Sequence, residues 1–501
     1  MKIFTAAQIR ACDAYTIHAS GIQSIALMER AAEKCVEWIV ENFPPDTLFV
    51  ALCGTGNNGG DGLAITRLLN QRGYGVKAFL IKFSEVLSAD CQINLDRLQA
   101  IDTDHVSIVQ PDKYITDIPA NIVFIDAILG TGLSRPVSGW IGNFIEHINN
   151  LPNRKIAIDI PSGLPADLVP DEDAAILKVQ DTLSFQFYKR SFLHAESGRF
   201  AGKIHILDIG LDSTFINATH TQYRAFGLAN AKEIYKSRDP FGHKGTFGSA
   251  LLIGGTYGRM GAITLSGKAA LRSGVGLITI LAPECGYNIL QTSIPEAMCH
   301  TSGEKEIENI SGWENMSVIG IGPGIGTGAK TAAAFAALLE SCTQPMVVDA
   351  DAINILAKQP ELLAKLPPGS IITPHPKEFE RLFGKNTNSM NQLDNARIQA
   401  MRYNITIILK GHHTAVITNE GECWYNMSGN SGMAKGGAGD VLTGIVTGLL
   451  AQGYEAVHAA SLGVYLHGLA GDLAAAELSE DALKAGDIVD YLGKAFLMVK
   501  G

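Results

Sequence analysis

Apolar residues recur along this chain at two spacings, which predict alternating helices and strands. Met28, Ala31, Ala32, Cys35 and Ile39 share one helical face, so Ile22–Asn42 is predicted to be an amphipathic helix. A glycine-rich loop over residues 54–62 and a helix over Leu63–Arg72 follow the first predicted strand. Short apolar runs predict strands at Leu48–Cys53, Val76–Ile81, Ile122–Ala127, Lys155–Ile160, Thr182–Phe187 and Ile204–Asp208. Such alternation predicts a mainly parallel sheet that binds ligands at the carboxyl ends of its strands.

The pattern lapses around Leu211–Lys232, where we expect a linker, and a second α/β series follows it. Gly261–Ser273, a segment starting at Asp440 and Glu455–Glu477 have helical spacing. Strands are predicted at Ser249–Gly254, Gly276–Leu281, Ser317–Gly322, Met346–Asp349, Ile371–Thr373, Ile405–Leu409 and Thr414–Thr418. The fold class is therefore α/β with two enzyme-sized domains, at residues 1–215 and 225–501.

Composition excludes several classes of protein. A hydrophobic content of 46% with 53 glycines is typical of a globular α/β enzyme. The net charge of -10 and the absence of a basic run argue against a nucleic-acid binder, and no apolar run is long enough to span a membrane. The eight scattered cysteines predict reduced thiols of a cytoplasmic protein and no zinc site.

The stretch Gly429–Gly448 carries the clearest chemical signal. Gly436, Gly437, Ala438 and Gly439 have little or no side chain, so their amide groups can turn toward one phosphate. The helix predicted to start at Asp440 adds its positive end, which stabilises an ionised carboxylate there. Asp440 is then a candidate base for a substrate hydroxyl. The alternative is a plain helix cap after a glycine-rich turn.

Three polar loops follow strands of the first series. The first holds Asn57, Asn58, Gly59, Gly60 and Asp61, whose amides and oxygens suit phosphate, ribose or a hard cation. Asp126 precedes the second loop and Asp159 the third, and each acid alone could simply cap a helix. The second loop consists of Gly130, Thr131, Gly132, Leu133, Ser134, Arg135 and Pro136, and the third contains Ser162. Three such loops on one sheet predict a binding site.

In the second series, prolines flank His375 and fix its backbone, although a capping or surface histidine is the alternative. A turn made of Lys410, Gly411, His412, His413 and Thr414 could contact a nucleotide phosphate. If this turn is extended, His412 and His413 point in opposite directions and are poor ligands for one metal.

These motifs together resemble one family. NNGGDG, IDAILGTGLSR and DIPSGL are similar to the N-terminal domain of the bifunctional NAD(P)H-hydrate repair enzymes. HKGTFGSALLIGG, GPGIG, TPHPKEFERL, KGHHT and GMAKGGAGD resemble the dehydratase domain of that family. The resemblance implies a Rossmann-like three-layer α/β/α domain fused to a ribokinase-like domain. It implies an isomerase, the epimerase of R and S hydrates of NADH or NADPH, and a lyase, the ADP-dependent dehydratase of the S form that yields AMP and phosphate.

The resemblance also implies residue roles. Potassium would be bound by Asn58, Asp126 and Ser162, and the hydrate in the first domain by Asn57–Asp61, Gly130–Pro136 and Asp159. The position of Asp126 and Asp159 at strand ends, and not the resemblance, makes one of them the candidate for handling a proton. In the second domain Asp440 is the implied base, and Mg²⁺ would accompany ADP. Hydrate contacts there would come from Ala262, Gly324, Gly326, His375 and Asp440, and nucleotide contacts from Lys410–Thr414 and Gly436–Gly439.

Two other interpretations remain open. The second half could be an ATP-using kinase for a vitamin precursor, although such a kinase has no need of the first half. The first half could be a non-catalytic binding module, although Asp61, Asp126 and Asp159 favour catalysis. Small-molecule substrates, a homo-oligomer, and neither nucleic-acid nor membrane partners are expected.

Overall fold

The computed structural model describes residues 1–101, 103–111, 118–133 and 135–501. The chain divides into two compact units, an N-terminal unit of Lys2–Thr221 and a C-terminal unit of Gln222–Gly501 together with Met1. The boundary between the units falls inside Leu211–Lys232, where a linker was predicted, but this stretch is not irregular: it contains helix α7 (Ser213–Ala218), strand β9 (Tyr223–Phe226) and the start of helix α8 (Leu228–Ile234). Each of these elements is too short to show a hydrophobic period. None of the described helices is both long and apolar enough to cross a bilayer.

The N-terminal unit is built on a parallel sheet in the order β4-β3-β2-β5-β6-β7-β8. Its strands are β2 (Leu48–Cys53), β3 (Gly75–Ile81), β4 (Val106–Val109), β5 (Val123–Ala127), β6 (Lys155–Ile158), β7 (Asp181–Phe185) and β8 (Lys203–Leu207), and a short β1 (Lys2–Ile3) starts the unit. β2, β5 and β6 are adjacent, so the three predicted polar loops leave the sheet side by side.

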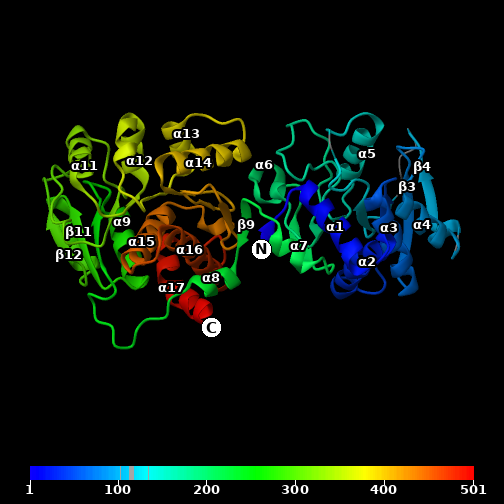
Figure 1. The fold of residues 1–501 in the computed structure, drawn as a ribbon, viewed down its shortest axis with the longest axis horizontal. Coiled ribbons are helices and arrows are strands. Elements are labelled where there is room, and N and C mark those ends of the chain that lie inside the picture. Colours follow the sequence, from blue (N-terminus) through cyan, green and yellow to red (C-terminus); the bar gives the residue numbers. More distant parts are fainter. Residues whose placement is uncertain (102, 112–117, 134) are drawn as a thin grey trace. The chain divides into compact units, whose positions relative to one another are not determined.

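Helices cover both faces of this sheet, as expected for a three-layer α/β/α sandwich (Figure 1). Alternate residues of β2 face opposite layers: Phe49, Ala51 and Cys53 pack with α2 and α3, whereas Val50 and Leu52 pack with α5. The helices are α1 (Ala6–Ser20), α2 (Ser24–Asn42), α3 (Asn57–Gln71), α4 (Ala89–Gln99), α5 (Gly139–Asn150), the short α6 (Ala195–Gly198) and α7, with 3-10 turns η1 (Thr103–His105) and η2 (Arg190–Leu193).

The C-terminal unit has its own sheet, in the order β9-β18-β17-β16-β15-β14-β13-β10-β11-β12. Within this order, the strands from β16 to β12, which include β10 and β11, are parallel to one another. Strand β17 is antiparallel to both of its neighbours. The strands after β9 are β10 (Ser249–Ile253), β11 (Leu277–Ala282), β12 (Met298–Thr301), β13 (Val318–Ile321), β14 (Met346–Val348), β15 (Ile371–Ile372), β16 (Thr406–Leu409), β17 (Ala415–Ile417) and β18 (Cys423–Asn426).

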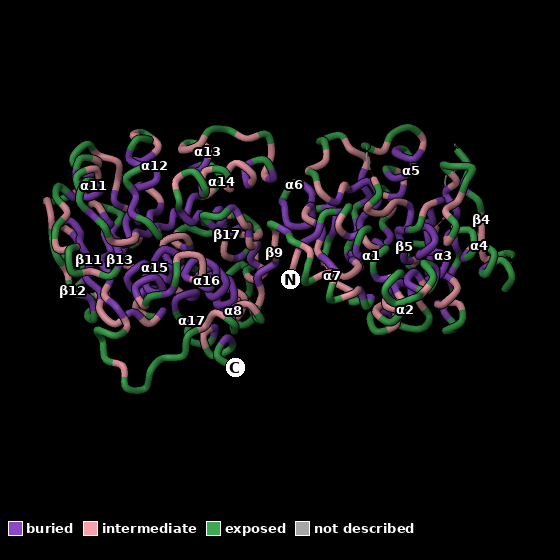
Figure 2. Tube along the Cα trace, in the orientation of Figure 1, coloured by how far each residue is buried: buried purple, intermediate pink, exposed green. Residues whose placement is uncertain are grey.

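Two apolar helices form the centre of the C-terminal core. Figure 2 shows α15 (Ala438–Ala451) and α16 (Ala456–Leu478) largely buried; α15 packs against α9, α16 packs against α8, and both pack against α17. The remaining helices and turns are α9 (Met260–Arg272), α10 (Tyr287–Ser293), α11 (Ala329–Ser341), α12 (Ala350–Lys358), α13 (Pro376–Phe383), α14 (Ser389–Tyr403), α17 (Ala485–Lys500), η3 (Glu284–Gly286), η4 (Pro360–Lys365) and η5 (Ser431–Met433).

Two predicted loops are helical. Asn57–Gly62 form the first turns of α3, and α15 begins at Ala438 rather than at Asp440. The sequence favours a loop in both places because glycine is a poor helix former, by about 1 kcal/mol per residue relative to alanine. Close packing reverses this preference in α3: a methyl group on Gly59 would lie 1.9 Å from the carbonyl oxygen of Gly54.

Candidate active sites

The three strand-end loops of the N-terminal unit are joined by hydrogen bonds. Asn58 Nδ2, at the start of α3, donates to the Leu129 carbonyl at 3.0 Å, and the Leu129 N–H donates to Ser162 Oγ at 2.8 Å. Ser162 in turn donates from Oγ and N–H to the two oxygens of Asp126 at 2.5 and 2.7 Å. The residues predicted as ion ligands, Asn58, Asp126 and Ser162, are therefore neighbours.

Asp126 lies beneath the surface of this site. Its side chain is fully buried at the end of β5, and both oxygens accept hydrogen bonds. Burial raises its pKa to about 6, against the opposing effect of the bonds from Ser162 and Ile128. The carboxylate is thus oriented by the protein and does not line the neighbouring cavity.

That cavity has a volume of about 1220 Å³ and collects most of the predicted residues. It is lined by Asn57, Asn58, Asp61, Gly130, Thr131, Gly132, Leu133, Arg135, Pro136 and Asp159, among others. Gly59 and Gly60 do not line it; a methyl group on Gly60 would lie 2.9 Å from Met28 Sδ, so both glycines serve helix packing. Ser134 lies outside the described residues.

Three ionisable groups that the sequence analysis missed complete this site. Arg10 and Asp13 reach the cavity from α1, and Lys189, just after β7, is fully buried. Lys189 Nζ donates to Asp159 Oδ1 at 2.5 Å and to Ser184 Oγ at 2.8 Å. Asp159 has a φ of +66°, a left-handed conformation that is unusual for a non-glycine residue and is often retained at functional sites.

We predict that Gly59→Ala destabilises the N-terminal unit, because the new methyl group would meet the backbone of Gly54 within 2.8 Å at three atoms. Backbone cannot move aside as a side chain can, so a loss of about 1–3 kcal/mol in the free energy of unfolding is expected. Thermal or urea unfolding measures this loss. Gly56→Ala is the matched control, since no atom lies within 4 Å of the added methyl group, and equal losses in the two variants would contradict the packing argument.

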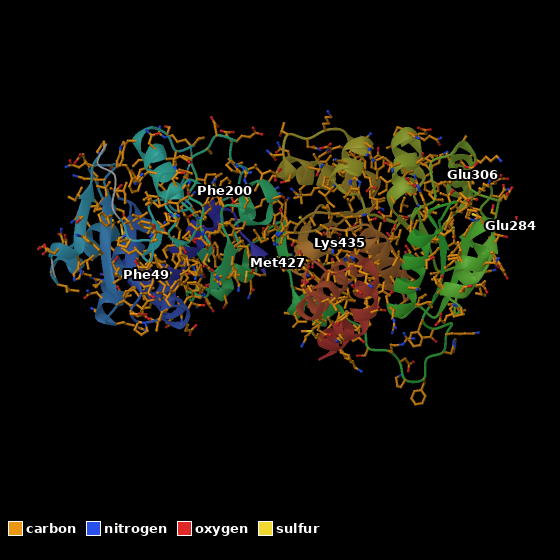
Figure 3. The ribbon with its side chains drawn as sticks, turned by 180° about the vertical axis from the view of Figure 1, so that it is seen from behind. Phe49, Phe200, Glu284, Glu306, Met427 and Lys435 are labelled. Carbon is orange, nitrogen blue, oxygen red and sulfur yellow. The ribbon has the colours of Figure 1, made fainter. Side chains whose placement is uncertain are left out.

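The second site lies at the start of α15. The N–H groups of Gly436, Gly437, Gly439 and Asp440 meet no acceptor among the residues that the structure describes. Lys435, labelled in Figure 3, precedes the glycines and donates from Nζ to the carbonyl of Asp481 at 2.6 Å. Unpaired amide groups at a helix N-terminus are able to bind an anion, which is the role predicted for this loop.

A lysine and a buried carboxylate connect this helix to the neighbouring strands. Lys410 Nζ donates to Asp349 Oδ1 at 2.7 Å, and Thr443 Oγ1 of α15 donates to Asp349 Oδ2 at 2.6 Å. A methyl group on Gly439 would lie 3.3 Å from Lys410 Nζ, so the KGHHT turn and the glycine loop meet. Asp349, which the sequence analysis did not select, is 1% exposed, and Lys410 together with Thr443 lowers its pKa despite burial.

Asp440 lies in the first turn of α15. Burial and the nearby charge of Asp349 raise its pKa to about 6, against the opposing effect of Lys410. The helix dipole favours the ionised form, as predicted from the sequence, but burial outweighs that effect. A carboxylate with this pKa is ionised at neutral pH and is still basic enough to accept a proton.

His375 caps a helix. Its Nδ1 accepts hydrogen bonds from the N–H groups of Lys377 and Glu378 at 3.1 and 3.3 Å, which is the capping alternative weighed for this residue. Burial, followed by the weaker and mixed effects of nearby charges, lowers its pKa. Because Nδ1 accepts from the backbone, the proton of neutral His375 lies on Nε2, which is 3.5 Å from Glu378 Oε1.

The other predicted contacts of the second site form two groups. Ala262 and Gly324 are neighbours, because a methyl group on Gly324 would lie 3.1 Å from Ala262 Cβ, and Gly326 N–H donates to Asp351 at 3.0 Å. Gly411 and Thr414 close a tight turn after β16. The turn is a bend and not extended, so the condition for an opposite orientation of His412 and His413 is not met, and their Nδ1 atoms lie 3.1 Å apart.

Each of the two units matches a known protein family. Residues 24–191 match the family model described as the YjeF-related protein N-terminus, and residues 250–494 match the model described as NAD(P)H-hydrate dehydratase. A solved ribokinase-like superfamily protein of Enterococcus faecalis is 28% identical with a TM-score of 0.50, and the match covers 57% of this chain and 99% of that one. The predicted fold class, including the ribokinase-like fold of the second half, is confirmed.

Relatives match nearly the whole chain. A protein of Moorella thermoacetica named bifunctional NAD(P)H-hydrate repair enzyme Nnr is 34% identical over 98% of this chain and 96% of its own length. A protein of the same name from Escherichia coli is 33% identical, covering 94% of this chain and 89% of its own length. The chain therefore belongs to the family of bifunctional NAD(P)H-hydrate repair enzymes.

Proposed function

We propose that this protein repairs hydrated nicotinamide cofactors in two steps. It interconverts the R and S hydrates of NADH or NADPH, and it dehydrates the S form with ADP, which yields the reduced cofactor, AMP and phosphate. We assign the epimerase to residues 1–215 and the dehydratase to residues 225–501. The observation that carries the proposal is the presence of two separate strand-end sites, one in each unit, in a chain matched to this family over almost its whole length.

In the epimerase, the hydrate would occupy the cavity whose lining includes Asn57, Asn58, Asp61, Gly130–Leu133, Arg135, Pro136 and Asp159. Sequence analysis left Asp126 and Asp159 as alternatives for the proton-handling group. Asp159 faces the cavity, whereas both Asp126 oxygens are engaged below it by Ser162 and Ile128. We therefore assign proton transfer to Asp159 and ion binding to Asp126.

The residues around Asp126 suit a potassium ion. Asn58 Oδ1 is buried and receives no hydrogen bond from the described residues. A buried polar atom normally has a partner, and a bound cation would supply one here. Oxygen atoms of Asn58, Asp126 and Ser162 would hold the ion, and hard monovalent cations prefer such oxygen ligands. A bound ion would supply positive charge that fixes the three loops around the hydrate.

We predict that potassium raises the melting temperature of the N-terminal unit. An ion that binds only the folded state adds about 2.7 kcal/mol at a concentration one hundred times its Kd, and each kcal/mol shifts the melting temperature of a unit of this size by about 2–4 °C. Calorimetry in potassium chloride against choline chloride at equal ionic strength measures the shift. In Asn58→Leu the potassium-specific shift is expected to vanish, and a shift that persists in this variant would contradict the assigned ligands.

In the dehydratase, the β-phosphoryl group of ADP would be transferred to the oxygen of the ring hydroxyl, and Asp440 would take the proton of that hydroxyl. The free amides of Gly436, Gly437 and Gly439 would stabilise charge on the transferring group. Lys410–Thr414 and Ala438 would contribute to the nucleotide site, and Ala262, Gly324, Gly326 and His375 to the hydrate site. The described residues contain no cluster of three His, Cys, Asp or Glu side chains that could hold a metal, so Mg²⁺ would be held mainly by the nucleotide phosphates.

The cysteines support a reducing compartment such as the cytoplasm. Apart from Cys423, the cysteines are free thiols, and five of these seven are buried. The proposed partners are small molecules, the two cofactor hydrates and ADP. The expected homo-oligomer, without nucleic-acid or membrane partners, stays a prediction.

The test uses a mixture of R and S NADH hydrates with ADP or ATP and magnesium, and follows recovery of the reduced-nicotinamide absorbance. Complete recovery, faster than the uncatalysed interconversion measured without protein, supports both activities. Recovery that stops at the S fraction would overturn the epimerase. No recovery with either nucleotide would overturn the dehydratase and favour the vitamin-precursor kinase.

A further inference from the structure

We propose that Asp13 is the catalytic acid of the epimerase and works opposite Asp159, which Lys189 holds as the catalytic base. Asp13 would protonate the hydroxyl that leaves the nicotinamide ring, and Asp159 would take the proton from the water that returns. The inference rests on the proposed epimerase function and deepens it, since Asp13 and Lys189 were selected neither by motif nor by composition.

The fold places Asp13 at the cavity wall. It belongs to α1, whose Ile9 and Cys12 pack into one cluster with Leu27 and Ala31 of α2 and with Phe187, two residues before Lys189. Two hydrogen bonds also hold the helix in place: Ala6 N–H donates to Asp167 at 2.9 Å, and Thr16 Oγ1 accepts from the Asp212 N–H at 2.9 Å. Asp13 follows Cys12 directly and lines the cavity.

Asp159 approaches the same cavity from β6 with one oxygen engaged. Lys189 Nζ and the Phe185 N–H donate to Oδ1 at 2.5 and 3.2 Å, and none of the described residues donates to Oδ2. Lys189 has no exposed side-chain surface and also donates to Ser184, so its ammonium group has a fixed position. Oδ2 of Asp159 is therefore available to a ligand, and the ammonium group of Lys189 balances the charge of the carboxylate.

Asp13 has the opposite environment. No described residue donates a hydrogen bond to its carboxyl group, and the negative charge of Asp159 acts on it across the cavity. Burial and the charge of Asp159 raise its pKa to about 6, against the opposing effect of Lys189. Two carboxyl groups in one cavity, one paired with a cation and one unpaired, are the arrangement that separates an acid from a base.

The other charged groups that face this cavity do not change the assignment. Arg10 from α1 and Arg135 from the second loop line its wall. Asp90 from α4 accepts a hydrogen bond from Ser24 Oγ. Asp61 from α3 is 8% exposed, and burial together with Asp159, Asp13 and Asp90 raises its pKa well above its usual range. This shift favours the neutral form of Asp61, which adds no charge to the cavity.

The step balances within the cavity. As the lone pair of the ring nitrogen forms a C=N bond, the C–O bond breaks, and the departing hydroxyl takes the proton of Asp13 and leaves as water. Water then adds to the opposite face, its electrons form the new C–O bond, the C=N electrons return to nitrogen, and its proton goes to Asp159. One proton has moved from Asp13 to Asp159, and exchange with solvent through the cavity restores both groups.

The test follows inversion of the pure R or S hydrate by chromatography in the full-length protein without nucleotide, so that the dehydratase is silent. Asp13→Asn is expected to lower kcat by about 10²-fold or more with KM within a few-fold, since that is the usual contribution of a general acid. Glu33→Gln, an exposed acid on α2, is the control and should match wild type. Retention of more than a third of the wild-type rate by Asp13→Asn would overturn the proposal.

The pH profile tests the same assignment without relying on a variant's fold. Because Asp13 must be protonated, wild-type kcat/KM is expected to fall as pH rises above about 6, after subtraction of the uncatalysed rate. A wild-type profile without this alkaline limb would overturn the proposal even if Asp13→Asn fails to fold. If wild type does not epimerise at all, the proposed function itself fails, which is a different result from loss in one variant.

Lys189 is a positioning residue, and its test separates charge from packing. Lys189→Met is expected to lower kcat with KM within a few-fold, because Asp159 loses the ammonium group that holds its carboxylate, whereas Lys189→Arg restores part of the rate. An unchanged kcat in Lys189→Met would overturn this role. In water enriched with ¹⁸O each inversion should incorporate one labelled oxygen, and inversion without label would overturn C–O cleavage.

Discussion

Asp440→Asn is expected to lower the rate of dehydration by about 10²–10⁴-fold, the usual contribution of a positioned general base, and to leave epimerisation unchanged. Asparagine keeps the size of the side chain and still suits the first turn of α15, but its amide cannot accept the proton of the ring hydroxyl. The substituted carboxylate oxygen of Asp440 lies near Lys410, Asp349 and the free amides of the glycine loop. Single-turnover recovery of the reduced cofactor from the pure S hydrate measures the loss.

The pH dependence of the same reaction follows from the environment of Asp440. Its pKa of about 6 means that the base is ionised above this pH, so the rate should fall about tenfold for each pH unit below 6. The residual rate of Asp440→Asn should lack this limb. Asp490→Asn on the exposed face of α17 is the control, and a loss there similar to that of Asp440→Asn would point to misfolding instead of chemistry.

Periodicity predicted the elements that bury a continuous apolar surface. Leu48–Cys53 was predicted with the bounds that it has, and Ile22–Asn42 contains α2. The same reasoning failed for the first turns of α3, where glycines look like a loop. Their helical state depends on contacts with Gly54 and Met28, and the identities of single residues do not reveal such contacts.

Motifs located the loops of both sites but not the groups that set their charge. Asp13 lies on a helix far along the chain from Asp159, and Lys189 is separated from Asp159 by a whole strand. Asp349 offered one usable signal, since it ends an apolar strand as Asp126 and Asp159 do. Its partners Lys410 and Thr443 are 61 and 94 residues away, a pairing that only the folded sheet defines.

Lys410→Met is expected to weaken ADP binding and to lower the free energy of unfolding of the C-terminal unit by about 3 kcal/mol. Removing one partner of a buried ion pair leaves the other charge unpaired, and such losses are typically about 3–5 kcal/mol. The lower end applies because Thr443 still donates to Asp349. Urea unfolding measures the stability, and calorimetric titration with ADP measures the affinity.

A second substitution separates the two roles of Lys410. In Lys410→Met with Asp349→Asn, no charge remains buried, so most of the lost stability should return, whereas the affinity for ADP should stay low because the cation beside Gly439 is still missing. Recovery of ADP binding in the double variant would show that Lys410 stabilises the fold without touching the nucleotide. Failure of both properties to recover would show that Asp349 supports Asp440 and α15 through Thr443 independently of the lysine.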